Sequence, residues 1–548
     1  MKILQINANY GLGSTGLIMR DIGDAIVDSG HEAYYAFQKC SEVPLNAYII
    51  GNTLDWKLHA ILCRIFGRQG FYSKSSTKKF LKYLEQIRPD IVHVHNLHSN
   101  YIHIELLFNY LAEHDIATVI TMHDCWYFTG KCFHYIDCGC ERFKSGCGKC
   151  IKKSAPPVSI IRDTSAKDWK VKNEVLHRIR RLAIVGCSNW IAKEAQKSFL
   201  GDCTISCIYN GVDTTIFSPK QNNLREKLGL SNQAFIVMGM ANKWMQECNV
   251  GIISKIMSIK GVTLMIVGCT ETQKQQLRIV DDHVISVGFI RSREELATYY
   301  NAADVFINLT HADTLPTVNM EAICCGTPVV TYNSSGSPEL VPIGMGIVVE
   351  ENDQEGIIQA VKKLQKQTVS IDNTLAKAMY NKNDNYYNIN RLFMITITKK
   401  EEVVLNQVEI FNPEYPDGVS IKFLKDELGF HEYDLVQILN TLSEKNLIEF
   451  NGSSVKLTIS DKEINAVKSK KDVEKIELNI KEKESYNLIK ELVDDKNLVS
   501  KYTLEGHLLY GDLKLSNFKM YHIILSLENK NLLKPIKKED GDYYLLVE

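Results

Sequence analysis

The segment Asp313-Thr-Leu-Pro-Thr-Val-Asn-Met-Glu321 runs directly into Ala-Ile-Cys-Cys-Gly-Thr-Pro-Val-Val. This order of residue types predicts a loop, a helix, a turn and a buried strand of β-branched residues. Seven residues separate the two acids, so Asp313 and Glu321 can bracket one ligand. Pro316, Thr317 and Val318 would open the helix, where backbone N–H groups without partners can bind an anion. Two acids for sugar hydroxyls beside such a terminus indicate a nucleotide-sugar site.

The overall composition is that of a soluble globular protein. The chain has 548 residues, enough for three or four domains, with 45% hydrophobic and 24% charged residues. Its formal net charge of −1 gives no guide to partners. The residues after Met1 read as a strand rather than a signal peptide, and no apolar run approaches the roughly 20 residues of a membrane-spanning helix. We therefore expect a cytoplasmic protein.

A glycine-rich loop lies near the start of the chain. Residues 2–7 and 32–37 read as strands, with an amphipathic helix between them. The loop Gly11-Leu-Gly-Ser-Thr-Gly16 precedes that helix, at the position where βαβ units hold phosphates. A tight turn that binds no ligand is the alternative interpretation.

Residues 54–88 interleave large apolar side chains, such as Trp56, Leu58 and Ile61, with basic ones. A helix of this composition can lie on a membrane surface, which would make the protein peripheral to the inner face of the membrane. We favour the alternative of a helix that packs on the sheet with its basic face in water.

Two predicted strands end in polar groups. His95-Asn-Leu-His98 follows an apolar run, and His123-Asp124 follows another. Ligands collect at the carboxyl ends of strands in open α/β sheets, so His123 is a candidate site residue. A structural histidine with satisfied hydrogen bonds is the alternative.

Cysteines gather between residues 125 and 150. The chain has 15 cysteines, a high count for a reducing compartment, where disulfides are rare. Cys147-Gly-Lys-Cys150 can turn two sulfurs toward one ion, and Cys132 and Cys140 would complete the four thiolates of a structural zinc site. Cys138 is an alternative to Cys140, and free or redox-sensitive thiols are the alternative to a metal.

A second α/β pattern follows the first, and strands that alternate with helices predict parallel sheets. Its predicted strands cover residues 234–239, 263–268, 284–288, 304–308 and 329–331. We predict an α/β protein with a first domain of residues 1–205, which carries the Cys-rich insert 125–150, and a second domain of residues 206–393. The two would face each other across a cleft.

Residues 1 to about 393 resemble the family-4 retaining glycosyltransferases of GT-B fold, near the colanic-acid and exopolysaccharide branch. Separated strings carry the resemblance: Gly13-Ser-Thr-Gly16, His95-Asn-Leu-His98, His123-Asp-Cys-Trp126, Asn210-Gly-Val-Asp213, Asp313 to Glu321, Cys325-Gly-Thr-Pro328 and Gly336-Ser-Pro-Glu339. It implies two Rossmann-like domains and transfer of a sugar from a nucleotide-sugar donor to a glycan or lipid-linked acceptor, with retention of configuration. It also implies a role in surface polysaccharide or glycoconjugate biosynthesis, without a catalytic metal or organic cofactor.

The resemblance implies roles for individual residues. Asp313 would contact the donor sugar and His123 would face it from the first domain, so these are the expected catalytic residues. Glu321 would hydrogen-bond the ribose hydroxyls, and the glycine-rich loop would meet the diphosphate. The full donor-binding set is Gly13, Ser14, Thr15, Gly16, Lys243, Pro316, Thr317, Val318 and Glu321.

One region departs from the family. Relatives carry a basic pair after the first strand of the second domain, whereas this chain has Glu247 and Cys248, with Lys243 as the nearby cation. Departure of a nucleoside diphosphate builds about two negative charges, which basic contacts stabilise. The alternative function is therefore a catalytically weak or inactive nucleotide-sugar-binding protein that reports to a regulatory tail.

The tail begins at Met394 and contains a repeat. The segment from Ile438 has a counterpart 85 residues later, from Ile523, and each reads as a helix followed by a short hairpin. The tail resembles two winged helix-turn-helix domains, residues 394–465 and 482–548, joined by a linker near 461–485. Residues 394–548 carry a net charge of about −6 by count, whereas a duplex binder shows a basic face. We therefore expect the tail to bind protein rather than DNA.

Overall fold

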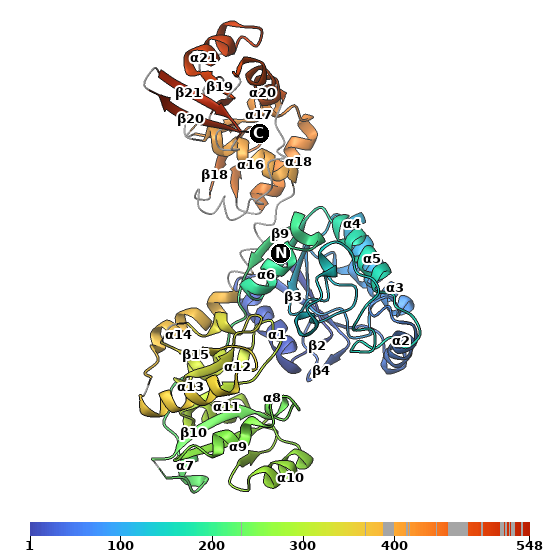
Figure 1. Ribbon diagram of the computed structural model, residues 1–548. Helices are drawn as coiled ribbons and strands as arrows, with labels where there is room; N and C mark the ends of the chain where they lie inside the picture. The colour runs from blue at the N-terminus through green and yellow to red at the C-terminus, as the bar shows by residue number, and fades with distance from the viewer. Residues whose placement is uncertain are drawn as a thin grey trace. The chain divides into compact units, whose positions relative to one another are not determined.

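The computed structural model describes residues 1–386, 389, 399–458 and 480–547, apart from residues 232, 343, 368, 413, 414, 416, 445, 446, 495, 496, 516–519, 521, 522, 525, 526, 528–531, 539 and 540. The chain divides into two compact units, Met1–Phe393 and Met394–Glu548, and each is described by itself (Figure 1). Most of the predicted linker near 461–485 lies outside the described residues.

The first half of the Met1–Phe393 unit is built on a parallel sheet. Its strands lie in the order β5 (Ala47–Ile49), β3 (Glu32–Phe37), β1 (Lys2–Ile6), β6 (Ile91–Val94), β7 (Ala117–Met122), β8 (Leu182–Gly186) and β9 (Thr204–Cys207). The central strands are apolar along their length because helices cover both faces of such a sheet. The sheet ends at Cys207, two residues past the predicted boundary at 205.

The helices of this half are α1 (Gly13–Asp28), α2 (Thr53–Phe66), α3 (Lys74–Ile87), α4 (Ile104–Glu113), α5 (Ser165–His177) and α6 (Asn189–Gln196). A small parallel pair, β2 (Asn9–Tyr10) and β4 (Lys39–Cys40), lies beside the sheet. Single 3-10 turns cover Ile136–Cys138, Arg142–Lys144 and Phe199–Asp202. The cysteine-rich insert therefore has little regular structure of its own.

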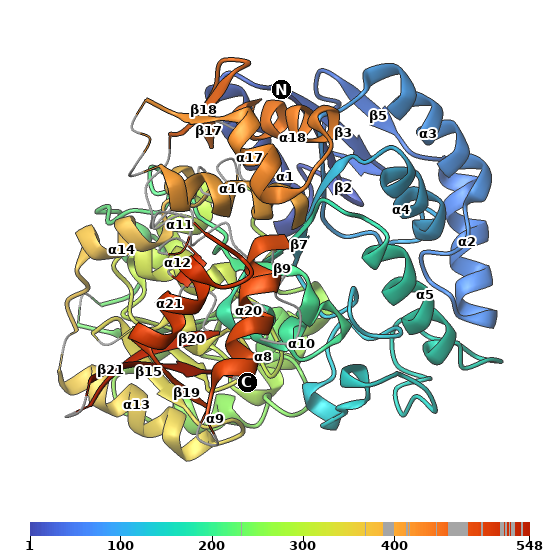
Figure 2. The same cartoon turned by 90° about the horizontal axis from the view of Figure 1, so that it is seen from above.

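The second half has its own parallel sheet, in the order β12 (Ile285–Val287), β11 (Val262–Val267), β10 (Phe235–Met240), β13 (Val305–Asn308), β14 (Val329–Tyr332) and β15 (Gly346–Val349). Its helices are α7 (Leu224–Lys227), α8 (Ala241–Trp244), α9 (Ile252–Met257), α10 (Glu271–Val280), α11 (Arg293–Ala302), α12 (Thr317–Cys324), α13 (Gln354–Lys366) and α14 (Asn373–Tyr380), with a 3-10 turn at Pro338–Leu340. The prediction of two Rossmann-like domains is confirmed, and Figure 2 shows the same elements from above.

Each sheet has one place where the strand order reverses. In the first sheet β1 lies between β3 and β6, and in the second β10 lies between β11 and β13. Ligands of open parallel sheets bind at the carboxyl ends of the strands at such positions. Each of the two sheets therefore has one edge at which a ligand is expected to bind.

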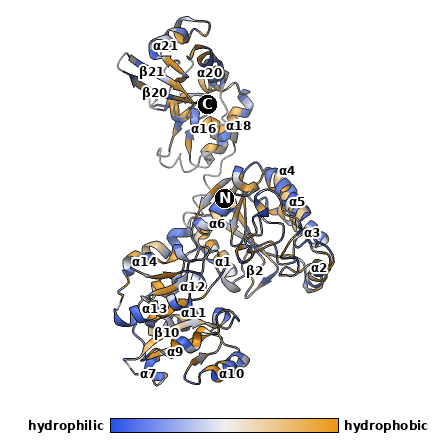
Figure 3. Ribbon diagram, viewed as in Figure 1, coloured by the Kyte–Doolittle hydropathy of each residue, from blue (hydrophilic) through white to orange (hydrophobic). Residues whose placement is uncertain are grey.

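Helix α2 differs from the favoured expectation of a packed helix with only its basic face in water. It buries His59 and Cys63 but exposes Leu54, Leu58 and Ile61. Figure 3 shows helices of both hydrophobic and hydrophilic colour around the two sheets. In the part of the chain that the structure describes, no helix is both long and apolar enough to span a bilayer.

The Met394–Glu548 unit contains two similar sets of elements. The first has α16 (Lys399–Phe411), β16 (Val419–Ser420), α17 (Ile421–Leu428), α18 (Glu432–Glu444), β17 (Ile448–Phe450) and β18 (Ser454–Leu457). The second has α20 (Ile480–Leu492), β19 (Leu498–Ser500), α21 (Lys501–Tyr510), β20 (Leu533–Lys538) and β21 (Gly541–Leu546). Each set carries a three-stranded antiparallel sheet, in the orders β16-β18-β17 and β19-β21-β20. The winged-helix interpretation stays a prediction.

Candidate functional site

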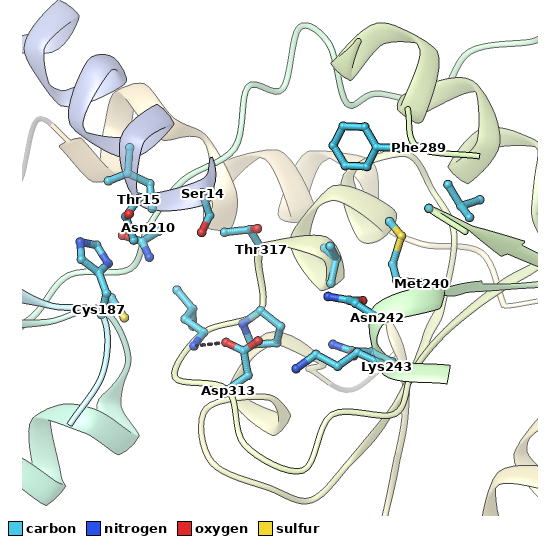
Figure 4. A pocket seen from close by; sticks show the side chains of 18 residues that line it. Ser14, Thr15, Cys187, Asn210, Met240, Asn242, Lys243, Phe289, Asp313 and Thr317 are labelled. Atoms are coloured by element: carbon cyan, nitrogen blue, oxygen red, sulfur yellow. Dashed lines mark hydrogen bonds between the residues drawn. The ribbon is translucent and has the colours of Figure 1, made fainter. Parts of the chain in front are cut away.

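A cavity of about 500 Å³ is lined from both halves of the Met1–Phe393 unit (Figure 4). From the first half it is lined by Ser14, Thr15, Ile18, His123, Cys187 and Asn210. From the second half it is lined by Met240, Asn242, Lys243, Val267, Gly268, Phe289, Asn308, Asp313, Leu315, Pro316, Thr317 and Val318. A volume of this size accommodates a small organic ligand.

Two helix N-termini open onto this cavity. Helix α1 begins at Gly13 after Leu12, and helix α12 begins at Thr317 after Pro316; neither preceding residue caps its helix with a side chain. Figure 4 shows Ser14 and Thr15 of α1 and Thr317 of α12 among the residues that line the cavity. First-turn N–H groups have no partners inside their own helix, and the helix dipole adds partial positive charge. The cavity is therefore suited to an anion.

Helix α1 approaches the preceding loop closely at Gly16. A Cβ atom at this residue would lie 3.2 Å from the backbone nitrogen of Gly11 and 3.3 Å from the carbonyl oxygen of Asn9. Gly13 begins the helix with φ of 65°, in the left-handed region that glycine adopts readily. Gly13 and Gly16 thus shape the first turn, while Ser14 and Thr15 present side chains to the cavity.

Asp313 and Lys243 bring opposite charges to the same cavity. Asp313 lies in the loop between β13 and α12, where its Oδ1 accepts a hydrogen bond of 3.2 Å from the Leu315 N–H. Burial raises the pKa of Asp313, although Lys243, His134 and this hydrogen bond oppose the rise. The Lys243 Nζ donates to Thr310 Oγ1 at 2.9 Å. Lys243 is the only lysine or arginine among the described residues that line the cavity.

His123 enters the cavity from the end of β7. Its Nε2 lies 3.0 Å from Nδ1 of His95, which follows β6. Burial lowers the pKa of His123 to about 4, although Asp124 opposes the shift, so the ring is neutral at pH 7. A neutral imidazole offers one donor and one acceptor, and its neighbours decide which nitrogen plays each part.

Asp124 faces the other way, toward His98. Its Oδ2 lies 2.8 Å from His98 Nε2, and its Oδ1 accepts from the Trp126 N–H at 2.8 Å. Burial raises the pKa of Asp124, but His98 and the two hydrogen bonds outweigh burial, so the pKa is lowered overall. This ionised carboxylate anchors the strand end that carries His123.

Glu321 is not among the residues that line the cavity. It lies on α12 one turn beyond Thr317, and its Oε2 accepts a hydrogen bond of 3.0 Å from the Tyr300 hydroxyl. Burial raises the pKa of Glu321, opposed by Tyr300 and Arg293. The structure thus brings Asp313 and the start of α12 to the cavity and places the second acid behind them.

Glu247 and Cys248 stand where the resemblance implies a basic pair, and they lie close to Lys243. Asn249 Nδ2 donates to the carbonyl oxygens of Lys243 at 3.0 Å and Leu309 at 2.9 Å, which ties the segment to β13. Cys248 is exposed. Neither Glu247 nor Cys248 lines the cavity.

The four predicted zinc ligands lie near one another but do not form a closed site. The neighbouring Cys132 thiol lowers the pKa of Cys150, and Cys147 interacts with Cys140 and Cys150. Among the described residues, no three of these sulfurs lie within 4.8 Å of one another. The Cys138 thiol donates to the Tyr135 carbonyl at 3.1 Å, and the choice between Cys140 and Cys138 as a ligand stays a prediction.

The two halves meet through Glu339. Its Oε2 accepts from the Asn189 N–H at 2.7 Å and its Oε1 from the Trp190 N–H at 2.6 Å, at the start of α6. The Tyr209 hydroxyl donates to Oε2 at 2.9 Å. A carboxylate of the second half thus caps a helix of the first.

Several cavity residues were not predicted as site residues. Cys187 follows β8, Met240 ends β10, Gly268 follows β11 and Asn308 ends β13. All of them occupy carboxyl ends of parallel strands, so the rule that singled out His123 could have found them. Asn210 and Phe289 lie in the loops that follow β9 and β12, so the same rule applies to them.

Two family models match this chain. Residues 17–216 match the model described as Glycosyltransferase Family 4, and residues 234–367 match the model described as Glycosyl transferases group 1. One match lies in each half of the Met1–Phe393 unit, and neither extends into the Met394–Glu548 unit.

Two of the curated relatives are named for polysaccharide biosynthesis. The putative colanic acid biosynthesis glycosyl transferase WcaC of Escherichia coli (strain K12) is 23% identical over 383 residues, covering 66% of this chain and 90% of that protein. The capsular polysaccharide biosynthesis glycosyltransferase CapM of Staphylococcus aureus is 28% identical over 169 residues, covering 28% of this chain and 43% of that protein.

A solved structure has the same fold. Sucrose-phosphate synthase from Thermosynechococcus elongatus superposes with a TM-score of 0.52 at 17% identity, covering 72% of this chain and 98% of that chain. At this identity the likeness concerns the fold alone, which is the GT-B arrangement of two parallel-sheet domains.

Proposed function

On the premise that the Met1–Phe393 unit is a family-4/group-1 glycosyltransferase of GT-B fold, we propose that it moves a sugar from a nucleotide-sugar donor to a glycan or lipid-linked acceptor, with retention of configuration. The setting would be surface polysaccharide or glycoconjugate biosynthesis, as in the relatives.

The convergence of two uncapped helix N-termini on one cavity carries this proposal. A nucleoside diphosphate places its negative charge between the first turns of α1 and α12, where N–H groups and Lys243 stabilise it. Asp313 and His123 line the same cavity, where they would contact the sugar hydroxyls. Because these dipoles are in place before reaction, they stabilise charge on the leaving group without reorganisation.

Titration calorimetry with UDP, GDP and their sugars tests donor binding, and a transfer assay follows with the nucleotide that binds. We expect Asp313→Asn to bind the donor but to lower turnover, because the nearly isosteric amide keeps the shape and removes the charge. Donor binding without transfer or hydrolysis by the native protein would support the alternative of a sugar-binding regulatory protein. Full activity of Asp313→Asn would contradict the role given to this carboxylate.

We propose a structural zinc ion in the cysteine-rich insert, bound by sulfurs that lie farther apart in this structure than such a site requires. Cys132, Cys140, Cys147 and Cys150 interact with one another, and a tetrahedral thiolate site needs sulfurs about 3.8 Å apart, at zinc–sulfur distances of about 2.3 Å. The insert has only short 3-10 turns, so it can contract around an ion. The ion would hold the insert together, and we assign it no catalytic step.

A peripheral membrane contact fits the exposed side of α2. Leu54, Leu58 and Ile61 are exposed along this helix, and Ile160 and Ile161 extend the surface because their N–H groups donate to carbonyl oxygens near its end. Exposed cations flank it: Lys57, Arg64 and Arg162. Apolar side chains ringed by basic ones suit an anionic bilayer.

Co-sedimentation with phosphatidylglycerol vesicles tests this contact, with phosphatidylcholine vesicles as the neutral comparison. Replacing Leu58 and Ile61 by serine should abolish sedimentation with the anionic vesicles. Ile279→Ser, at an exposed isoleucine on α10, is the matched control and should change nothing. Equal sedimentation of all variants would refute this contact.

The tail would bind protein rather than nucleic acid, because its net charge of about −6 opposes a duplex. A gel shift with random duplex at low salt tests this expectation, and a shifted band would contradict it.

A further inference from the structure

Cys248 differs from nearly all other cysteines in this protein. Within the described part of the chain, only Cys207 and Cys248 are exposed. Burial of the sulfur raises the pKa of Cys207 to about 12, so we expect that thiol to react slowly at neutral pH. Cys248 instead has an imidazole beside its sulfur, with 3.4 Å between Cys248 Sγ and His311 Nε2.

His311 is oriented by two acceptors. Its Nδ1 lies 2.9 Å from Oε1 of Glu351, and its Nε2 lies 3.1 Å from Oδ1 of Asn249. The Asn249 amide is fixed in direction because its Nδ2 donates to the carbonyl oxygens of Lys243 and Leu309. Its Oδ1 can therefore only accept.

Both nitrogens of His311 thus lie within hydrogen-bond reach of oxygen atoms, and Glu351 and Asn249 hold the ring in one orientation. His311 Nε2 also lies within hydrogen-bond reach of Cys248 Sγ, so the imidazole can take the thiol proton as the sulfur reacts. Tyr332 packs on the His311 ring at 5.2 Å and faces Cys248, with Asp353 also nearby. A nucleophile, a base and a carboxylate that orients the base form the arrangement of an activated thiol.

We propose that Cys248, with His311 and Glu351, is a modification site for thiol–disulfide exchange with low-molecular-weight disulfides. His311 takes the proton of the Cys248 thiol as the Cys248 sulfur attacks one sulfur of the disulfide; a new sulfur–sulfur bond forms and the original bond breaks. The departing thiolate takes the proton from His311. Cys248 is oxidised to a mixed disulfide, and the other half of the reagent is reduced to a thiol.

The position of this thiol gives the modification a consequence. Asn249 holds the backbone at Lys243, which lines the cavity, so a group added at Cys248 would strain the wall that the proposed function assigns to the diphosphate. This consequence rests on the proposed function, whereas the reactivity of Cys248 does not.

Limited reaction of the zinc-loaded native full-length chain with dithiodipyridine at pH 7, followed by mass mapping of every cysteine, tests the site. We expect Cys248 to react about ten-fold faster than Cys207, and His311→Gln to slow Cys248 by about ten-fold without changing Cys207. Cys150 is mapped separately because it is one of the proposed zinc ligands.

The Cys207 rate also reports folding, since unfolding would expose that sulfur and speed its reaction. If His311→Gln raises the Cys207 rate, Glu351→Gln replaces it as the test variant, because Glu351 is a partly exposed side chain. Equal rates at Cys207 and Cys248 in the native chain, or an unchanged Cys248 rate in a folded variant, would overturn the proposal.

Discussion

His95 and His123 are joined by a hydrogen bond of 3.0 Å between Nδ1 of the first and Nε2 of the second. Gln5 decides its direction. The Gln5 Nε2 donates to the Met19 carbonyl at 2.9 Å, so its Oε1, 3.2 Å from His95 Nε2, accepts from that nitrogen. Burial lowers the pKa of His95 well below its ordinary value, so the ring is neutral and its Nδ1 accepts from His123 Nε2–H. His123 is thus left with Nδ1 as an acceptor, which suits a sugar hydroxyl as its donor.

We predict that His95 and His123 are both protonated on Nε2 alone at pH 7. Nitrogen NMR of protein labelled at histidine distinguishes the two tautomers. Gln5→Met removes the acceptor and should shift both rings, while Gln86→Met, on α3, should shift neither. An Nδ1-protonated His123 in the native protein would contradict this direction of hydrogen bonding.

Lys243→Met should weaken binding of a nucleoside diphosphate by about 10- to 100-fold, because a charge-assisted hydrogen bond contributes about 1.5–3 kcal/mol. The matched control is Lys255→Met, at an exposed lysine paired with Glu355 on the far helices of the same half. Calorimetry measures both variants. An unchanged affinity in Lys243→Met would mean that the helix termini alone hold the anion.

Glu339→Gln should lower the free energy of unfolding of the Met1–Phe393 unit by about 1–2 kcal/mol, because it removes a negative charge from the N-terminus of α6. Denaturant titration measures the change. Glu350→Gln is the control, since Glu350 accepts only an exposed bond of 3.2 Å from Asn333 among the bonds described for it. Equal stability of the two variants would show that the carboxylate contributes no more than an amide.

Acid should destabilise the protein through its buried neutral histidines. Burial lowers the pKa of His59 to about 3, and Gly70 N–H donates to its Nε2 at 3.3 Å. The unfolded chain takes up a proton at His59 near pH 6.5 while the folded chain does not, so stability is complete above pH 6.5 and falls as pH falls toward 3. At pH 5 the loss from His59 is about 2 kcal/mol.

Denaturant titrations at pH 7.5 and pH 5 check this prediction. The loss of stability between the two pH values should be about 2 kcal/mol smaller in His59→Gln than in the native protein. His283→Gln, at an exposed histidine, should keep the native pH dependence. The same dependence in all three proteins would exclude His59 as a source of acid sensitivity.

Protein purified without chelator should contain about one zinc ion per chain, bound by Cys132, Cys140, Cys147 and Cys150. Chelation should lower the melting temperature, because the insert has little other structure to hold it. Cys140→Ser should lose the metal and Cys40→Ser, outside the insert, should retain it. Zinc well below one ion per chain would leave the cysteines as free thiols.

Local sequence patterns were sufficient for much of the fold. The Gly-Thr-Pro turn after Asp313 to Glu321 predicted the helix and strand that the structure shows as α12 and β14. These predictions succeed because helix and strand periods, turns and caps involve residues close together in the chain. The cavity-lining positions of Asp313 and His123 also follow from the rule for strand ends.

Other features depend on contacts between distant residues. The direction of Glu321 toward Tyr300, the pairing of His95 with His123, and the cap that Glu339 places on α6 each join separate strands or separate halves. The composition of residues 54–88 predicted one helix, whereas the structure has two, α2 and α3. The sequence could not say which face of α2 would stay exposed, because that depends on what the rest of the chain covers. The sequence thus determined which elements form and where the ligand edge lies. Tertiary packing decided which side chains reach the cavity, their tautomers and their charges, because these depend on burial and on hydrogen-bond partners that folding brings from far along the chain.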